Sequence, residues 1–395
     1  MKNKIDFLDL GSQPLANSYL KKDDFKKKEK KYRLKICFDK KTKLVSIKKK
    51  FSSKIMFDNK YPYRSSMSST MINSFKKLAQ DIRHKFKPKK LLEIGSNDGS
   101  FLKNFDKNKT IGIEPCTNIE KITKKLKFNT IGKYWDTKLA KYILKKFNKV
   151  DVIYSANTIT HIKNLDDVFK AINIVLSDNG VLIIEDPSLL ECLKKNAYDQ
   201  FYNEHIYLFS YTSLKNLLKK HKLEIFKIET LDVHGGSNRY FIKKDICIRK
   251  IDISVEKNRK LEKKYGLDAD ITYFKFAKRV KKSREQLRYI FKKCKQNNKK
   301  IIGYGATAKS TTILNYCKID NKTIDYFVDT TEAKQNKYTP GTKIFIRKYK
   351  GYIDNDVDFV FLGAWNFQKE IFLKEKKFIK DGGKFIVHTP YPKII

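Results

Sequence analysis

Short apolar segments alternate with segments of helical periodicity between residues 76 and 240, and this alternation constrains the fold more than any other feature. The apolar segments are KKLLEIGS, KTIGIEP, VDVIYSAN and GVLIIEDP. Segments such as NLDDVFKAINIVLSDNG lie between them, with the spacing of an amphipathic helix and a glycine at the predicted helix end. Because parallel strands need a crossover connection, usually a helix, the pattern predicts a doubly wound α/β domain.

Changes in this pattern predict four regions. Residues 1–75 consist of short irregular segments with turn sequences such as GSQP and YPYRSS, and residues 76–249 form the alternating domain. Residues 250–299 lack strand patterns and predict one or two charged helices as a connector. In residues 300–395 the alternation resumes with KKIIGYGA, TIDYFVD, DVDFVFLGA and GKFIVHTP, which predicts a second, smaller α/β domain.

The chain carries a formal charge of +44, from 87 Lys and Arg against 43 Asp and Glu. Such an excess attracts polyanions and makes their binding dependent on salt. However, only ten of the basic residues are Arg, and the Lys residues are spread along the whole chain. Proteins that recognise bases or phosphates place Arg at chosen positions, so this distribution argues against nucleic acid as the substrate.

The cysteines show no pattern of pairing. Six of them, at positions 37, 116, 192, 247, 294 and 317, are scattered without a CxxC pair. This usage is typical of a reduced protein and predicts a cytoplasmic location. No apolar segment is long enough to cross a bilayer, and MKNKIDFLDLGSQPLANSYL lacks the apolar core of a secretory signal. We therefore expect no membrane association.

The segment LLEIGSNDGSFL places a glycine-rich turn between the first strand of the alternating domain and the following helix. Its spacing, E-x-G-x-x-x-G from Glu93 to Gly99, differs from the G-x-G-x-x-G turn that suits a pyrophosphate. Glu114 ends the second strand, where a carboxylate can accept hydrogen bonds from both hydroxyls of a ribose. A structural turn followed by a surface acid is the alternative interpretation.

Together, this loop and Glu114 resemble the class I S-adenosylmethionine-dependent methyltransferases. The resemblance implies that residues 93–99 hold the amino-acid part of the cofactor and that Glu114 binds its ribose. The predicted cofactor-binding residues are Glu93, Gly95, Asn97, Asp98, Gly99, Glu114, Pro115 and Asn157.

A second glycine loop, GYGATA, matches G-x-G-x-x-A, and Asp329 follows it at the end of YFVD. Taken alone, these features predict a dinucleotide site and a dehydrogenase. The remaining residues show no separate apparatus for hydride transfer. A Rossmann-like unit that presents its loop and helix end to the phosphates of a sugar nucleotide is therefore the preferred interpretation, with NAD as the second.

Nine unusual segments follow one another along almost the whole chain. They are LDLGSQPLANSYL, YPYRSSMSSTM, LEIGSNDGSFL, GIEPCTN, SANTITHI, FYNEHIYLFS, HGGSNRYF, GYGATAKSTTILNYC and YTPGTKIFI. In this order they resemble the sugar C-methyltransferases of deoxysugar biosynthesis. The resemblance implies a zinc-binding N-terminal module, a central methyltransferase domain and a C-terminal Rossmann-like domain that helps to hold the substrate. It also implies methylation of a carbon next to a ketone, on a nucleoside-diphosphate-linked sugar.

The N-terminal module departs from that family in its metal ligands. Family modules hold tetrahedral zinc with four cysteines in two close pairs. Here the first pair has no counterpart, and Cys37 in ICFDKK stands alone with Lys40 at the position of its partner. One thiolate cannot hold structural zinc, so we expect no metal site and a module held together by packing.

Carbon methylation by a sulfonium needs a carbon nucleophile, which a sugar offers only as the enolate of a neighbouring ketone. The site must therefore supply a base and donors to the enolate oxygen. His205 in YNEHIYLFSY is the predicted base, because an imidazole with an ordinary pKa of about 6.5 is mostly neutral at working pH. The family resemblance assigns Glu204 to orient His205 or bind a sugar hydroxyl, and Tyr202 to donate to the oxyanion or the sugar.

The resemblance also carries over His161 from ANTITHI and one tyrosine of YPYRSS, taken as Tyr63 in preference to Tyr61. Adjacent side chains on a strand point to opposite faces, so Glu204 and His205 can share a pocket only if the chain bends. His234 is expected to occupy a tight turn next to glycines, without a functional role.

The main prediction is an S-adenosylmethionine-dependent C-methyltransferase of a keto sugar. An RNA methyltransferase that uses the positive field, and methyl transfer to oxygen or nitrogen of another small molecule, remain alternatives. A sugar-nucleotide-binding relative without catalysis is a third, since the zinc ligands are already lost. The YNEH segment argues against it, because a binding protein has little need of a base.

Overall fold

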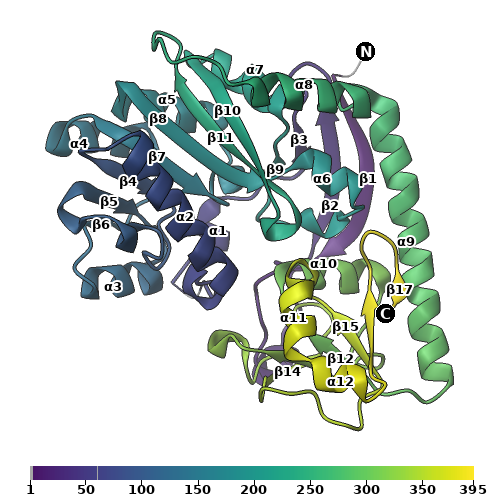
Figure 1. The fold of residues 1–395 in the computed structure, drawn as a ribbon. Coiled ribbons are helices and arrows are strands. Elements are labelled where there is room, and N and C mark those ends of the chain that lie inside the picture. Colours follow the sequence, from purple (N-terminus) through teal and green to yellow (C-terminus); the bar gives the residue numbers. More distant parts are fainter. Residues whose placement is uncertain (1–2, 60) are drawn as a thin grey trace.

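The structure, a computed structural model, describes residues 3–59 and 61–395. Its strands form three sheets, which lie in the N-terminal, central and C-terminal parts of the molecule (Figure 1). No helix in the described residues is long and apolar enough to span a membrane.

The N-terminal sheet has the order β1-β2-β3-β9 and is antiparallel throughout. Its strands are β1 (Lys4–Gln13), β2 (Tyr32–Asp39), β3 (Val45–Ile47) and β9 (Tyr207–Leu208), and helix α1 (Ser53–Met56) follows β3. The fourth strand belongs to the YNEHIYLFSY segment, so the predicted catalytic segment is built into this sheet.

This region is more regular than the irregular segments that the sequence predicts. The side chains of Leu34, Ile36 and Phe38 alternate along β2 and are buried. Charged residues on the other face pair across strands, as between Arg33 and Asp9 and between Lys48 and Asp6. The strands were missed because these charges hide the apolar alternation in a Lys-rich sequence.

The central sheet has the order β10-β11-β8-β7-β4-β5-β6, and only β11 runs antiparallel to its neighbours. Its strands are β4 (Leu91–Ile94), β5 (Thr110–Ile113), β6 (Thr130–Ile131), β7 (Val150–Ala156), β8 (Leu176–Pro187), β10 (Leu223–Leu231) and β11 (Ser237–Lys244). All four predicted apolar segments are strands of this sheet, which confirms the doubly wound prediction.

The helices of this part are α2 (Ser69–Lys85), α3 (Thr117–Lys125), α4 (Thr137–Phe147), α5 (Leu165–Val175), α6 (Leu189–Lys194) and α7 (Tyr211–Lys219). The prediction that the helix in NLDDVFKAINIVLSDNG ends at its glycine is wrong, since α5 ends at Val175 and β8 begins at the next residue. The physical reason is that Leu176 is fully buried and pairs with Val150, which holds it in extended form.

Two helices connect the central and C-terminal parts. They are α8 (Ile253–Tyr265), which ends at Gly266 in the left-handed conformation, and α9 (Asp270–Gln296). Figure 1 shows α9 running from the N-terminal sheet to the C-terminal part. On the N-terminal side, Tyr273 of α9 stacks on Phe38 and also meets Phe7.

The C-terminal sheet has the order β14-β13-β12-β15-β16-β17 and is parallel except for β17. Its strands are β12 (Ile301–Tyr304), β13 (Tyr326–Asp329), β14 (Phe345–Lys348), β15 (Phe359–Leu362), β16 (Lys384–Val387) and β17 (Lys393–Ile394). Its helices are α10 (Ala308–Cys317), α11 (Gln368–Lys374) and α12 (Lys376–Lys380). The predicted second α/β unit is therefore present.

The N-terminal module also contacts the C-terminal part directly. The Tyr19 hydroxyl donates to the Ala306 carbonyl at 2.6 Å, and the Thr311 hydroxyl donates to the Ala16 carbonyl at 3.1 Å. The backbone N–H of Gly341 donates to the Glu29 carboxylate at 2.9 Å. These bonds hold the start of the chain against the second glycine loop.

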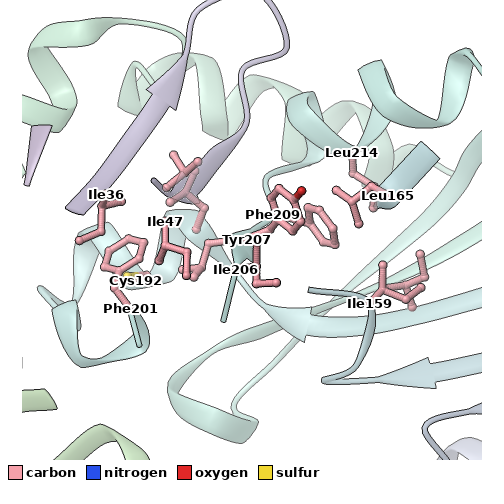
Figure 2. Close-up of a cluster of buried hydrophobic side chains, with 14 of the residues drawn as sticks. Ile36, Ile47, Ile159, Leu165, Cys192, Phe201, Ile206, Tyr207, Phe209 and Leu214 are labelled. Atoms are coloured by element: carbon pink, nitrogen blue, oxygen red, sulfur yellow. The ribbon is translucent and has the colours of Figure 1, made fainter. Parts of the chain in front are cut away.

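The segment around the predicted base is packed on both sides. Figure 2 shows Ile206, Tyr207 and Phe209 in the middle of a buried cluster. Ile36 and Ile47 of the N-terminal sheet lie on one side, and Leu165 and Ile159 of the central domain on the other. Burial of this much apolar surface fixes the backbone next to His205, which a base needs for accurate placement.

Candidate active site

A cleft of about 390 Å³ is lined by residues of the N-terminal, central and C-terminal parts. It collects every predicted site residue except Asp98 and Gly99. The predicted residues that line it are Tyr63, Glu93, Gly95, Asn97, Glu114, Pro115, Asn157, His161, Tyr202, Glu204 and His205.

The loop after β4 turns sharply at Gly95, which has φ +74°. A Cβ at this position would lie 2.2 Å from Thr158 Oγ1, so only glycine fits. The backbone N–H groups of Gly95 and Ser96 both donate to the Ile113 carbonyl, at 2.8 and 3.0 Å. The turn therefore brings the backbone close to the end of β5, at the carboxyl edge of the sheet.

Two carboxylates face the cleft beside this loop. Glu114 accepts hydrogen bonds from the backbone N–H of Asn97 at 2.9 Å and of Cys116 at 2.8 Å. Burial raises the pKa of Glu114, although these bonds oppose the rise. Burial and the nearby Asp98 and Glu114 raise the pKa of Glu93 well above its ordinary range.

The Oε2 atom of Glu93 is buried and has no hydrogen-bond partner among the described residues. A buried carboxylate oxygen without a partner is costly, and a cationic ligand would satisfy it. The carboxylates of Glu93 and Glu114, next to the sharp turn at Gly95, therefore fit a cationic ligand such as S-adenosylmethionine.

Asp98 and Gly99 instead lie against a second, smaller hollow of about 210 Å³. The Asp98 carboxylate accepts from the backbone N–H of Ser66 at 3.1 Å and from the Ser100 hydroxyl at 2.6 Å. These bonds tie the glycine loop to the segment before α2. Asp98 thus holds the glycine loop in shape. The sequence spacing alone could not distinguish this role from contact with a ligand.

The Glu204–His205 pair lies in an irregular bend between Phe201 and Ile206, so both side chains face the cleft. His205 Nδ1 lies 2.9 Å from the Gln200 carbonyl, which can only accept, so Nδ1 carries the hydrogen. His205 Nε2 therefore accepts from the Tyr202 hydroxyl, at 2.6 Å. Burial, together with His161 and Lys309, lowers the pKa of His205 well below its ordinary value. The ring is thus neutral at physiological pH, as a general base requires.

Glu204 is bound by other residues, and the described residues show no hydrogen bond between it and His205. Its Oε1 accepts from Asn17 Nδ2 at 2.7 Å, and its carboxylate also accepts from the Tyr61 hydroxyl. Burial raises the pKa of Glu204 to about 7, and the bonds from Asn17 and Tyr61 oppose the rise.

Tyr61 therefore contacts the Glu204 carboxylate, although the sequence-based prediction preferred Tyr63. Tyr63 also lines the cleft but is 40% exposed, and its carbonyl accepts from Asn97 Nδ2 at 3.3 Å. The two residues share one turn, and the sequence carries no signal for which of them points inward.

His161 lies next to His205, and their rings stack at 5.1 Å between centroids. The ring of His161 also stacks on Phe57, at 5.3 Å between centroids. Burial lowers the pKa of His161 to about 3. Its Nε2 has no partner within the part of the chain that the structure describes, and the residue lines the cleft.

Sequence reasoning missed Asn17, Gln200 and Lys309 as site residues. Asn17 and Lys309 belong to segments that the sequence singles out, LDLGSQPLANSYL and GYGATAKSTTILNYC. In the sequence, the sign that Asn17 and Lys309 could belong to the site is that each is a polar residue next to small or turn-forming residues. Gln200 contacts His205 through its backbone carbonyl, which a residue of any type could supply.

The carboxylate of Asp329 is hydrogen-bonded to the second glycine loop. Asp329 accepts from the backbone N–H of Ala306 at 2.9 Å and of Thr331 at 2.8 Å, and Lys334 pairs with it at 3.3 Å. An acid held in this way is poorly placed to bind the ribose of a dinucleotide. Lys309, at the start of α10, is buried at the cleft, and burial lowers its pKa to about 8.

The raised pKa of Glu204 predicts a pH-dependent stability. The folded protein holds this proton more tightly than the unfolded chain, so the stabilisation is complete below about pH 4.5 and is lost as the pH rises through 7. Glu204→Gln keeps an acceptor for Asn17 but cannot ionise. We expect wild type to lose about 2.5 kcal/mol more unfolding free energy than this variant between about pH 5 and about pH 8. Urea unfolding at both pH values measures the difference, and parallel pH curves would contradict the assignment.

Comparisons with known proteins agree along the whole chain. Consecutive regions match three families: a zinc binding domain over residues 1–57, a methyltransferase domain over 63–228, and a C-methyltransferase C-terminal domain over 232–390. The C-methyltransferase NovU of Streptomyces niveus is 28% identical, over 99% of this chain and 94% of its own length.

Solved structures also resemble part of the chain. A methyltransferase of Clostridium acetobutylicum that depends on S-adenosylmethionine is 14% identical with a TM-score of 0.35, over 44% of this chain and 92% of its own. The PH0226 protein of Pyrococcus horikoshii is 15% identical with a TM-score of 0.36, over 46% of this chain and 94% of its own.

The strand order of the central sheet and the match to a methyltransferase domain define the class of protein. The chain is an S-adenosylmethionine-dependent methyltransferase with the class I fold. Within this class it resembles the C-methyltransferases: its C-terminal part matches the C-methyltransferase C-terminal domain, and NovU is similar to it over nearly the full length. This bears out the resemblance to the sugar C-methyltransferases that the nine ordered segments carry.

The N-terminal residues do not fit the zinc that the first family match implies. Cys37 Sγ lies 3.4 Å from both the carbonyl and the hydroxyl of Ser46. Lys40, at the position of a second cysteine, pairs with Asp270 of α9. Within residues 3–59 and 61–395, no group of three or more His, Cys, Asp or Glu is placed to hold a metal ion. No step of the chemistry below uses a metal, and the zinc-free module stays a prediction.

Proposed function

We propose that the protein methylates a carbon next to the ketone of a nucleoside-diphosphate-linked keto-deoxysugar, in the cytoplasm. The observation that carries this proposal is the neutral His205 ring, whose Nε2 faces a cleft shared with the cofactor loop. The similarity to a C-methyltransferase supports carbon as the accepting atom. The six cysteines are free, which supports a reducing compartment.

His205 acts as the base in this proposal. Its Nε2 takes a proton from the sugar carbon, so a C–H bond breaks, an N–H bond forms and the electron pair enters the enolate. Tyr202 turns its hydroxyl hydrogen from His205 to the enolate oxygen and stabilises the negative charge there. The proton on Nε2 passes to solvent after the reaction.

When bound, S-adenosylmethionine supplies the electrophilic methyl group, and the sulfur keeps the electron pair of the broken bond. Glu93 and the turn at Gly95 would hold the amino-acid end of the cofactor, and Glu114 would hold its ribose. Glu204, with Asn17 and Tyr61 behind it, accepts a hydrogen bond from a sugar hydroxyl. Holding both partners in one cleft replaces an encounter in solution and lowers the barrier.

The C-terminal wall of the cleft is proposed to hold the diphosphate. Lys309 and Lys334 both line it, and the first turn of α10 begins there. Lysine side chains and the N-terminal end of a helix attract phosphate oxygens. A substrate that spans from His205 to this wall must carry a polar, anionic end, which favours a nucleotide sugar over a small neutral acceptor.

An RNA methyltransferase is the second candidate from the charge. Residues from three parts of the chain surround the cleft, and they include buried histidines and tyrosines. RNA would instead need an open groove lined by basic residues. An RNA substrate would need affinity that falls steeply with salt. Filter binding with a mixed RNA pool at physiological salt tests this candidate.

The direct test incubates the protein with methyl-labelled S-adenosylmethionine and a panel of nucleotide keto sugars in deuterated water. We expect label on a sugar carbon, and deuterium exchange at the same carbon when the methyl donor is left out. Transfer to oxygen or nitrogen, or label on no sugar of the panel, would contradict the proposed function.

A further inference from the structure

Asp199 is fully buried between the central and C-terminal parts and is held from the C-terminal side. Its Oδ2 accepts from Trp365 Nε1 at 2.6 Å and from His388 Nε2 at 3.2 Å. Both donors are buried as well. Hydrogen bonds to an ionised carboxylate are about twice as strong as neutral ones, so this contact fixes Asp199 firmly.

Asp199 lies in a single 3-10 turn, Tyr198–Gln200, next to the residue that binds the base. The carbonyl of Gln200 accepts the Nδ1 hydrogen of His205 at 2.9 Å. The side chain of Gln200 donates to the His234 carbonyl at 2.7 Å, and Lys309 Nζ donates to the same carbonyl at 3.2 Å. The turn is therefore fixed at Asp199, at Gln200 and at the loop that bears His234.

The direction of the Gln200 carbonyl determines which nitrogen of His205 is free. With the hydrogen on Nδ1, Nε2 has the lone pair that faces Tyr202 and the cleft. If the turn rotates, the carbonyl no longer selects this tautomer, and the ring can place its hydrogen on Nε2. A ring in that form cannot accept a proton from a substrate at Nε2.

We propose that Asp199 is a positioning residue, through which Trp365 and His388 of the C-terminal part hold His205 in the tautomer that acts as base. This inference rests on the proposed role of His205 and adds a function for the C-terminal part beyond binding substrate. Asp199 does not line the cleft, so it acts through the turn and does not touch the substrate.

Two variants loosen the contact from opposite sides. Asp199→Asn keeps the shape and removes the charge, and Trp365→Phe removes the 2.6 Å donor and keeps an aromatic ring. Thr389→Val is the matched control, because it removes a bond across the same interface, from the Thr389 hydroxyl to the Lys195 carbonyl at 2.6 Å. That bond lies next to His388 but involves neither the Asp199 carboxylate nor the Gln200 carbonyl, so it tests the interface without these two groups.

The first measurement is the ¹⁵N spectrum of histidine-labelled protein without substrate, in which His205 is assigned by its loss in His205→Gln. We expect a single Nδ1–H form in wild type and in Thr389→Val, and a mixture of tautomers in Asp199→Asn and Trp365→Phe. This readout needs no turnover, so it stays decisive even if the proposed sugar is wrong. Unchanged His205 signals in both Asp199→Asn and Trp365→Phe would overturn the inference.

The second measurement is turnover with a sugar that wild type methylates. We expect kcat to fall about ten- to hundredfold in Asp199→Asn, as for a lost charged hydrogen bond, with KM for S-adenosylmethionine unchanged. Thr389→Val should keep the wild-type kcat even where its melting temperature falls. An equal loss of kcat in the control would show that the interface matters only for folding and would also overturn the inference.

Discussion

His205→Gln is expected to lower kcat by about 10²- to 10⁴-fold, which is the usual contribution of a general base. Glutamine fills most of the space of the ring and can still donate to the Gln200 carbonyl, but it offers no atom that takes a proton at neutral pH. The affinity for S-adenosylmethionine should stay near that of wild type, because the cofactor loop is formed by other residues. Turnover and isothermal titration with the cofactor measure the two quantities separately.

The matched control for this variant is His234→Asn. His234 also lines the cleft, and burial lowers its pKa to about 3, but its Nε2 has no partner among the described residues. It has φ +53°, a conformation that asparagine tolerates. We expect this control to keep kcat within a few-fold of wild type. If His205→Gln keeps full turnover and full deuterium exchange, the base lies elsewhere, and Glu204 becomes the first residue to test.

The sequence predicted the parts of the fold that depend on local pattern. The apolar segments that end at Ile94, Ile113 and Ala156 are parallel strands of one sheet, and their ends lie at the same edge as the glycine loop after β4. Gly95 was predictable from the same local pattern, because a strand-to-helix turn at that edge needs a residue in the left-handed conformation.

The sequence could not predict contacts between residues far apart in the chain. Asn17 meets Glu204 across 187 positions, and Trp365 meets Asp199 across 166. No periodicity connects such residues, because the contact depends on how the three sheets pack. Because Glu204 and His205 are neighbours in sequence, one prediction was that Glu204 orients His205. In the structure Glu204 points toward Asn17, and the backbone carbonyl of Gln200 contacts His205 instead.

These long-range contacts share one consequence for the chemistry. The N-terminal module reaches Glu204 through Asn17, and the C-terminal part reaches His205 through Asp199 and Gln200. A buried acid and a buried neutral imidazole are both costly to hold in a fixed state. The three parts of the chain together supply the hydrogen bonds that do so.

Gly95→Ala is expected to reduce the affinity for S-adenosylmethionine by at least about tenfold and to lower the unfolding free energy by about 1–3 kcal/mol. The added Cβ would lie 2.2 Å from Thr158 Oγ1 and 2.7 Å from Thr158 Cγ2, so the loop or Thr158 must shift. Either shift moves the backbone that faces the cofactor. Isothermal titration gives the affinity, and urea unfolding gives the stability.

Gly11→Ala separates the two causes of this effect. Gly11 has φ +76°, almost the same as the +74° of Gly95, but a Cβ there would meet nothing within 4 Å. It should therefore cost about 1 kcal/mol of stability from backbone strain and leave cofactor affinity unchanged. Adding Thr158→Ala to Gly95→Ala removes the two nearest atoms and should restore part of the affinity. If Gly95→Ala binds the cofactor as wild type does, the loop after β4 is not the surface on which the cofactor rests.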